Sequence, residues 1–142
     1  MKLILDLDTG IDDAMALAYA VGSPDLELIG VTGTYGNVYT KVGVQNVLNL
    51  LEMMGKPEIP VFVRHEVSAR IHGENGVGQV ELPVAAEHAS KMDAVDFIIE
   101  SVKKYGKELV IVATGPQTNL AAALNKAPEI KENMGKIVIM GG

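Results

Sequence analysis

The sequence predicts an α/β fold in which a mostly parallel, open, Rossmann-like sheet carries helices on both faces. Short apolar runs alternate with longer helical patterns along the chain. Within the short runs the apolar residues are continuous, which is typical of parallel strands buried on both sides. The chain has 142 residues, of which 48% are hydrophobic, so it can form one domain with its own core.

Five apolar runs are the predicted strands, and right-handed crossovers are expected to join them. The runs span residues 2–7, 26–32, 61–63, 109–113 and 136–140. The last run has the character of a strand that lies inside a sheet, buried on both faces. Because the chain stops at residue 142, we expect a fold truncated after this fifth strand, with an exposed apolar edge that pairs with another chain.

Four helices are predicted between the strands. They span about residues 11–21, 40–54, 93–104 and 118–126. Asp93 is a suitable N-cap for the third helix, and Gly106 is a suitable stop. Residues 68–92 interrupt the alternation, and because this segment is long and holds several glycines, it is either a functional loop or an insertion.

Composition narrows the classes of function. The net charge of −6 and the pI near 5.0 argue against a nucleic-acid partner. The absence of cysteine excludes disulfides, thiolate metal sites and cysteine nucleophiles. No apolar stretch reaches the ~20 residues of a membrane span. The apolar run at the N-terminus is too short for a signal peptide, because the acidic residue Asp6 follows soon after it. We therefore expect a cytoplasmic protein with no membrane partner.

Four aspartates, Asp6, Asp8, Asp12 and Asp13, lie where the first predicted strand turns into the first helix. Carboxylates ~4 Å apart at a surface repel by roughly 4 kcal/mol, so a fold that gathers them needs a cation, a shared proton or a helix N-terminus. Oxygen-only clusters suit Ca²⁺ or Mg²⁺. The alternative is that the acids are solvated side chains that are favoured in the first turn of a helix. This alternative explains Asp12 and Asp13 but not Asp6 and Asp8, which continue the strand.

Polar residues also follow the other predicted strands at their carboxyl ends, where open parallel sheets bind ligands. These residues are the segment 35–37, Arg64, the pair 114–115 and the pair 141–142. Together with the acids they predict one active site along the edge of the sheet formed by the carboxyl ends of the strands, which we call the rim. The sequence has no Gly-x-Gly-x-x-Gly motif, P-loop or Gly-x-Ser-x-Gly elbow, so a dinucleotide, P-loop or serine-hydrolase site is not expected.

The acidic run, Asp6-Leu7-Asp8-Thr9-Gly10-Ile11-Asp12-Asp13-Ala14, resembles the Asp-x-Asp-(Pro/Thr)-Gly-x-Asp-Asp-Ala signature of the inosine–uridine-preferring nucleoside hydrolases. Segments 31–37, 71–76 and 113–119 match further family motifs in the same order. The chain ends about halfway through the domain of such enzymes. The resemblance therefore implies that residues 1–142 are the N-terminal part of a single nucleoside hydrolase-like α/β domain.

The resemblance implies hydrolysis of the N-glycosidic bond of purine or pyrimidine ribonucleosides. Asp8, Asp13 and the backbone carbonyl of Thr114 would ligate Ca²⁺, with water and a later aspartate completing the shell. Asp8 would also act as the general base on the attacking water.

The resemblance further implies substrate contacts. Asp12 and Asn37 would hold ribose hydroxyls, and His72 would approach the substrate when its loop closes as a lid. Asp6 would orient its neighbours without touching the metal. Relatives are usually homodimers or homotetramers, so we expect an oligomer, or a second chain that supplies the missing half. Because later site residues are absent, we expect the isolated chain to be inactive.

Two other functions remain open on the residues alone. A haloacid-dehalogenase-type phosphatase would use Asp6 as nucleophile and Asp8 as acid/base with Mg²⁺. The order Thr9-Gly10, in place of the Gly-Thr usual there, counts against this function. The third possibility is a non-catalytic fragment that needs a partner chain.

Overall fold

The computed structural model describes residues 1–64, 76–78 and 80–141. One sheet has the strand order β3-β2-β1-β4-β5, and every neighbouring pair is parallel. Its strands are β1 (Lys2–Leu7), β2 (Glu27–Gly33), β3 (Val61–Val63), β4 (Leu109–Ala113) and β5 (Lys136–Ile139). The parallel sheet predicted from the apolar runs is confirmed, with each strand end within one residue of its predicted place.

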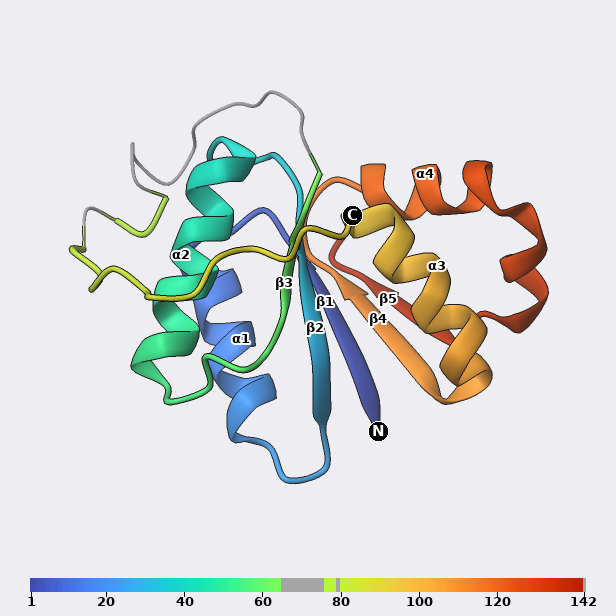
Figure 1. The fold of residues 1–142 in the computed structure, drawn as a ribbon, viewed down its shortest axis with the longest axis horizontal. Helices are drawn as coiled ribbons and strands as arrows, with labels where there is room; N and C mark the ends of the chain where they lie inside the picture. Colours follow the sequence, from blue (N-terminus) through green and yellow to red (C-terminus); the bar gives the residue numbers. More distant parts are fainter. Residues whose placement is uncertain (65–75, 79, 142) are drawn as a thin grey trace.

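Helices cover both faces of the sheet, with α1 and α2 on one face and α3 and α4 on the other (Figure 1). Their bounds are α1 (Ile11–Gly22), α2 (Thr40–Met53), α3 (Ala94–Tyr105) and α4 (Thr118–Lys126), with short 3-10 helices η1 (Gly106–Glu108) and η2 (Pro128–Asn133). No helix among the described residues is long and apolar enough to cross a membrane.

The helix α3 begins and ends where local chemistry predicts. Asp93 caps it, because Oδ1 accepts a hydrogen bond of 2.8 Å from the backbone N–H of Val95. Gly106 follows the last turn with a φ of +52°, a left-handed value that glycine adopts without steric strain. Between them, Ile98 and Val102 are buried against the sheet.

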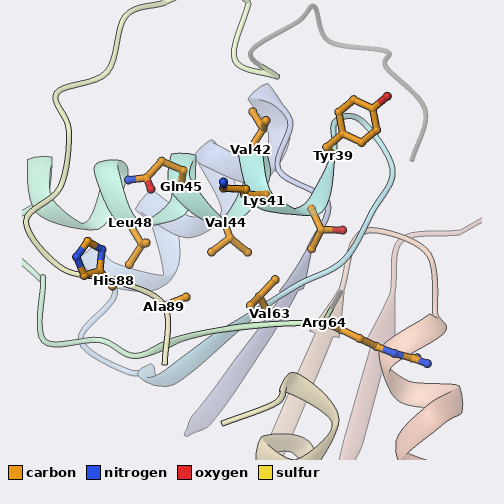
Figure 2. A pocket seen from close by; sticks show the side chains of 11 residues that line it. Tyr39, Lys41, Val42, Val44, Gln45, Leu48, Val63, Arg64, His88 and Ala89 are labelled. Atoms are coloured by element: carbon orange, nitrogen blue, oxygen red, sulfur yellow. The ribbon is translucent and has the colours of Figure 1, made fainter. Parts of the chain in front are cut away.

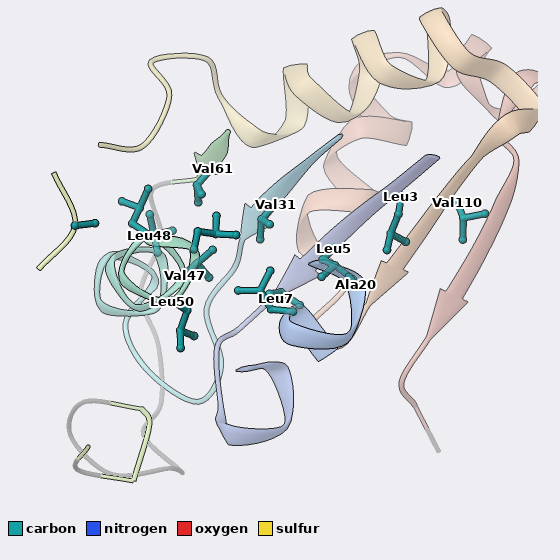
Figure 3. Close-up of a cluster of buried hydrophobic side chains, with 14 residues drawn as sticks. Leu3, Leu5, Leu7, Ala20, Val31, Val47, Leu48, Leu50, Val61 and Val110 are labelled. Atoms are coloured by element: carbon teal, nitrogen blue, oxygen red, sulfur yellow. The ribbon is translucent and has the colours of Figure 1, made fainter. Parts of the chain in front are cut away.

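Side chains of β1 alternate between the two faces of the sheet, and this alternation positions the acids. Leu3, Leu5 and Leu7 pack in the cluster beneath α1 and α2 (Figure 3). Ile4 packs in the opposite cluster, with α3 and α4. Because alternate residues of a strand face opposite sides, Asp6 shares the face of Ile4 and is directed toward α4.

The strand β5 has the exposure expected of the open edge of a truncated sheet. Its composition is that of a strand buried on both faces, yet all four of its residues are exposed, and Ile139 retains 55% of its accessible surface. The reason is its place in the sheet, since β5 is an edge strand that, among the described strands, pairs only with β4. The expected apolar edge is confirmed, whereas its pairing with another chain stays a prediction.

Candidate active site

The candidate site lies where the carboxyl ends of β1 and β4 lie side by side. The chain runs from β1 through β2 to β3 on one side of the sheet and then returns to place β4 and β5 on the other. The connections that leave β1 and β4 therefore diverge, and open α/β sheets bind ligands in the crevice at such a point. Asp8 follows β1 and Thr114 follows β4. The residues predicted at the rim therefore lie at the point where the strand order of the sheet reverses.

Asp6 is fully buried at the end of β1. Its Oδ1 accepts hydrogen bonds from the Thr32 hydroxyl at 2.6 Å and from the Asn119 amide at 2.8 Å. Burial raises the pKa of Asp6 to about 6, and the nearby charge of Asp8 acts in the same direction. A carboxylate with no exposed surface cannot reach a substrate, so this position contradicts a nucleophilic role for Asp6 and suits an orienting one.

Asp8 directly follows β1 at this edge of the sheet and keeps 9% of its surface exposed. Its Oδ2 accepts a hydrogen bond of 3.1 Å from the backbone N–H of Asn37. Two glycines give it room, because a Cβ atom on Gly36 would lie 2.0 Å from Oδ2 and one on Gly115 would lie 2.9 Å from the Asp8 Cβ. Backbone from the ends of β2 and β4 thus holds this carboxylate in place.

Asp13 joins the first turn of α1 to the end of β4. Its Oδ2 accepts a hydrogen bond of 2.6 Å from the backbone N–H of Gly10, and its Oδ1 accepts one of 2.5 Å from the Thr114 hydroxyl. The residue is 1% exposed. Burial raises the pKa of Asp13, and the charges of Asp8 and Asp12 raise it further. Asp13 therefore lies close enough to Asp8 and Asp12 for their charges to act on its carboxylate.

The loop that joins β1 to α1 is anchored from the side by Thr9. This residue is 1% exposed and has a φ of +31°. Such a left-handed backbone costs a non-glycine residue about 1–3 kcal/mol and is found where the surrounding structure enforces it. The Thr9 hydroxyl donates to the carbonyl of Gly43 in α2 at 3.1 Å. This contact fixes the loop that carries the acids against the neighbouring helix.

The donor set at the rim fits a hard divalent cation. Asp8, Asp13 and the carbonyl of Thr114 offer only oxygen, the ligand type that Ca²⁺ prefers. The neighbouring carboxylates raise the pKa of Asp13, and a bound cation would offset that repulsion. The part of the chain that the structure describes holds no group of three acidic or histidine side chains suited to a metal. Thus two carboxylates here need carbonyl, water or later ligands to complete a shell.

The structure describes two of the three residues that are predicted to contact the substrate. Asp12 is exposed in the first turn of α1, next to Asp13. Asn37 is 8% exposed, and its backbone rather than its side chain supports Asp8. The predicted substrate contact of His72 lies outside the described residues.

Sequence reasoning missed much of the rim's supporting hydrogen-bond network. The Thr34 hydroxyl lies 2.8 Å from that of Thr118, and Arg64 donates to the Thr118 carbonyl at 3.1 Å. These contacts tie the ends of β2 and β3 to the start of α4. Arg64 therefore contacts the backbone at the rim. In the sequence, its position directly after a predicted strand is the signal that places it there.

A separate cavity of about 780 Å³ lies beside α2 (Figure 2). Val44, Leu48 and Val63 give it an apolar lining, and Arg64 and His88 also border it. None of the rim acids lines it. The carboxylates at the ends of β1 and β4 therefore lie outside this cavity, whereas Arg64 borders it and also contacts the rim.

Comparison with known proteins agrees with this geometry. The family model "Inosine-uridine preferring nucleoside hydrolase" matches residues 3–142. Uridine nucleosidase 1 of Arabidopsis thaliana is 40% identical over 99% of this chain and 45% of its own length. A pyrimidine-specific ribonucleoside hydrolase, RihA, of Salmonella enteritidis is 36% identical over 100% of this chain and 48% of its length. The chain thus spans about half the length of the curated relatives it matches.

A solved structure gives the same result for the fold. A purine-preferring ribonucleoside hydrolase from Gardnerella vaginalis superposes with a TM-score of 0.92 and 55% identity, over 100% of this chain and 49% of that protein. The parallel sheet, the acids at its rim and the match over residues 3–142 lead to one conclusion. The chain belongs to the inosine-uridine preferring nucleoside hydrolase family.

Proposed function

We propose that the protein hydrolyses the N-glycosidic bond of ribonucleosides, yielding ribose and the free base, with Ca²⁺ held by Asp8, Asp13 and the carbonyl of Thr114. The observation that carries this proposal is the convergence of the two acids with Thr114 at the ends of β1 and β4. Family membership supports the reaction class, because the relatives above are named as nucleosidases and ribonucleoside hydrolases.

The rim residues provide the parts that water attack requires. When bound, Ca²⁺ would lower the pKa of a coordinated water. Asp8 is the proposed general base: its carboxylate accepts the water proton while the Asn37 N–H steadies Oδ2. The water oxygen then bonds to C1′ of the ribose as the bond to the base breaks, and the bonding electrons leave with the base, which takes up a proton.

Asp12 and Asn37 are the proposed partners of the ribose hydroxyls. A site that pairs with these hydroxyls discriminates against sugars without them, because its own polar groups would be left unpaired. His72 is also proposed to approach the substrate. Both purine and pyrimidine nucleosides belong to the proposed substrate class, since the similar proteins include purine-preferring and pyrimidine-specific enzymes.

The relatives' greater length supports a further part of the proposal. This chain covers 45% to 49% of the relatives described above. We therefore propose that groups outside residues 1–142 complete the metal shell and the substrate pocket. In this view the chain alone is inactive, and activity requires the complete protein, as a homo-oligomer or with a second chain.

A substrate screen of the full-length protein tests the proposed reaction. With Ca²⁺ present, we expect release of base from inosine or uridine and no turnover of p-nitrophenyl phosphate. Hydrolysis of p-nitrophenyl phosphate with Mg²⁺ would favour the phosphatase instead. The burial of Asp6, which would be the nucleophile of that phosphatase, argues against this outcome. Inactivity of the full-length protein on all three compounds would favour a non-catalytic role.

A further inference from the structure

A buried amide joins three elements behind the rim. Asn119 lies in the first turn of α4 and is fully buried. Its Nδ2 donates to Oδ1 of Asp6 at 2.8 Å and to the carbonyl of Gly33 at 3.3 Å. Both partners are acceptors, so only a side chain with two donors can satisfy them from this position. Asn119 therefore connects α4 to the ends of β1 and β2.

Asp6 holds both ends of the loop that leads from β4 into α4. At one end its main-chain carbonyl accepts a hydrogen bond of 3.0 Å from the N–H of Thr114. At the other end its side chain accepts from Asn119. Because a single residue binds both ends, the loop cannot shift along β1 without breaking one of these bonds. The loop carries the Thr114 carbonyl that the proposed function assigns to Ca²⁺.

Stability alone does not account for this pair. Among the described residues, Oδ2 of Asp6 and Oδ1 of Asn119 are buried without a hydrogen-bond partner. Leaving buried polar atoms unpaired is destabilising, and well-packed apolar residues often serve a fold as well or better. The arrangement therefore suits a role in orienting the loop, in addition to any role in holding the helix.

We propose that Asn119, acting through Asp6, is a positioning residue that sets the Thr114 carbonyl for Ca²⁺. The inference rests on the proposed function, because it assumes that this carbonyl is a ligand. Asn119 and Asp6 have no exposed surface, so neither touches the substrate. Outer residues that orient metal ligands typically change metal affinity by about 10–100-fold when they are replaced.

Calorimetric titration of the metal-free, full-length protein with Ca²⁺ tests the inference. Asn119→Leu keeps the size and the charge but removes both donors, and we expect the Kd for Ca²⁺ to rise about 10–100-fold. Asn49→Leu is the matched control. Asn49 is 6% exposed in α2 and accepts a 2.8 Å hydrogen bond from the Ala85 N–H, away from the rim. We expect this control to lower Tm while leaving the Kd unchanged.

A purely structural role would give a different pattern. If Asn119→Leu lowered Tm as Asn49→Leu does and left the Kd unchanged, the inference would be overturned. Should Asn119→Leu fail to fold, Asn119→Ser makes a smaller change, because one hydroxyl can donate to at most one of the two acceptors. A folded Asn119→Ser protein with a Kd about tenfold weaker than that of the unmodified protein would support the inference, and one with an unchanged Kd would overturn it.

The unmodified protein separates this inference from the proposed function. If it binds Ca²⁺ and Asn119→Leu binds equally well, only the positioning role fails. If the unmodified protein binds no Ca²⁺, the proposed function fails, and the inference fails with it.

Discussion

Asp8→Asn is expected to reduce nucleoside hydrolysis by the full-length protein by at least ~10²–10⁴-fold, the usual effect of removing a general base. The amide cannot take up the proton of the attacking water, and it is a neutral ligand where the cation would have a charged one. The fold should survive, since the amide oxygen can still accept from the N–H of Asn37 as Oδ2 does now. Measurement of kcat on inosine and uridine, beside a thermal melt, checks both expectations.

Asp25→Asn is the matched control for this substitution. Asp25 is exposed in the turn between α1 and β2, at the opposite end of the sheet from the rim. The same change of chemistry should leave kcat unaltered there. If Asp8→Asn kept the turnover of the unmodified protein, Asp8 could not be the general base, and the mechanism proposed for the rim would be wrong.

Gly36→Ala is expected to impair activity through Asp8 without altering any polar group. The new Cβ would lie 2.0 Å from Oδ2 of Asp8, far inside van der Waals contact, so the carboxylate or the loop after β2 must move. Displacement of a catalytic group by about 1 Å can lower the rate ~10²-fold. We expect a loss of at least this size in kcat/KM for inosine and uridine.

Gly22→Ala controls for the loss of a glycine. Gly22 ends α1, and a Cβ there meets nothing within 4 Å. Alanine is also favoured over glycine in helices, so this variant should keep full activity and an equal or higher Tm. Equal activity of Gly36→Ala and Gly22→Ala would show that Asp8 does not need its present position.

The fold was largely predictable because its signals are local. Continuous apolar runs identified all five strands, and the caps of α3 were visible as Asp93 and Gly106. The order of the strands within the sheet is not a local property. Strand β5 illustrates this: its composition is that of a buried strand, whereas its exposure depends on which strand lies next to it.

The candidate site was predictable only where its residues are close in sequence or follow a strand. The acids are close together in sequence, and Thr114 directly follows β4. The supporting contacts met neither condition, because Asn119 reaches Asp6 across 113 positions and Thr32 reaches it across 26. The room that Gly36 leaves for Asp8 was equally hidden, since it depends on the distance between two loops that only the folded chain brings together.

The dependence of nucleoside hydrolysis on free Ca²⁺ tests the central claim most directly. The rates on inosine and uridine would be measured with the full-length protein after chelation and dialysis, and then as Ca²⁺ is added back. The account predicts that chelation abolishes hydrolysis and that Ca²⁺ restores it along a saturable curve. Hydrolysis at an unchanged rate in the metal-free protein would contradict the claim that Asp8, Asp13 and Thr114 act by holding this cation.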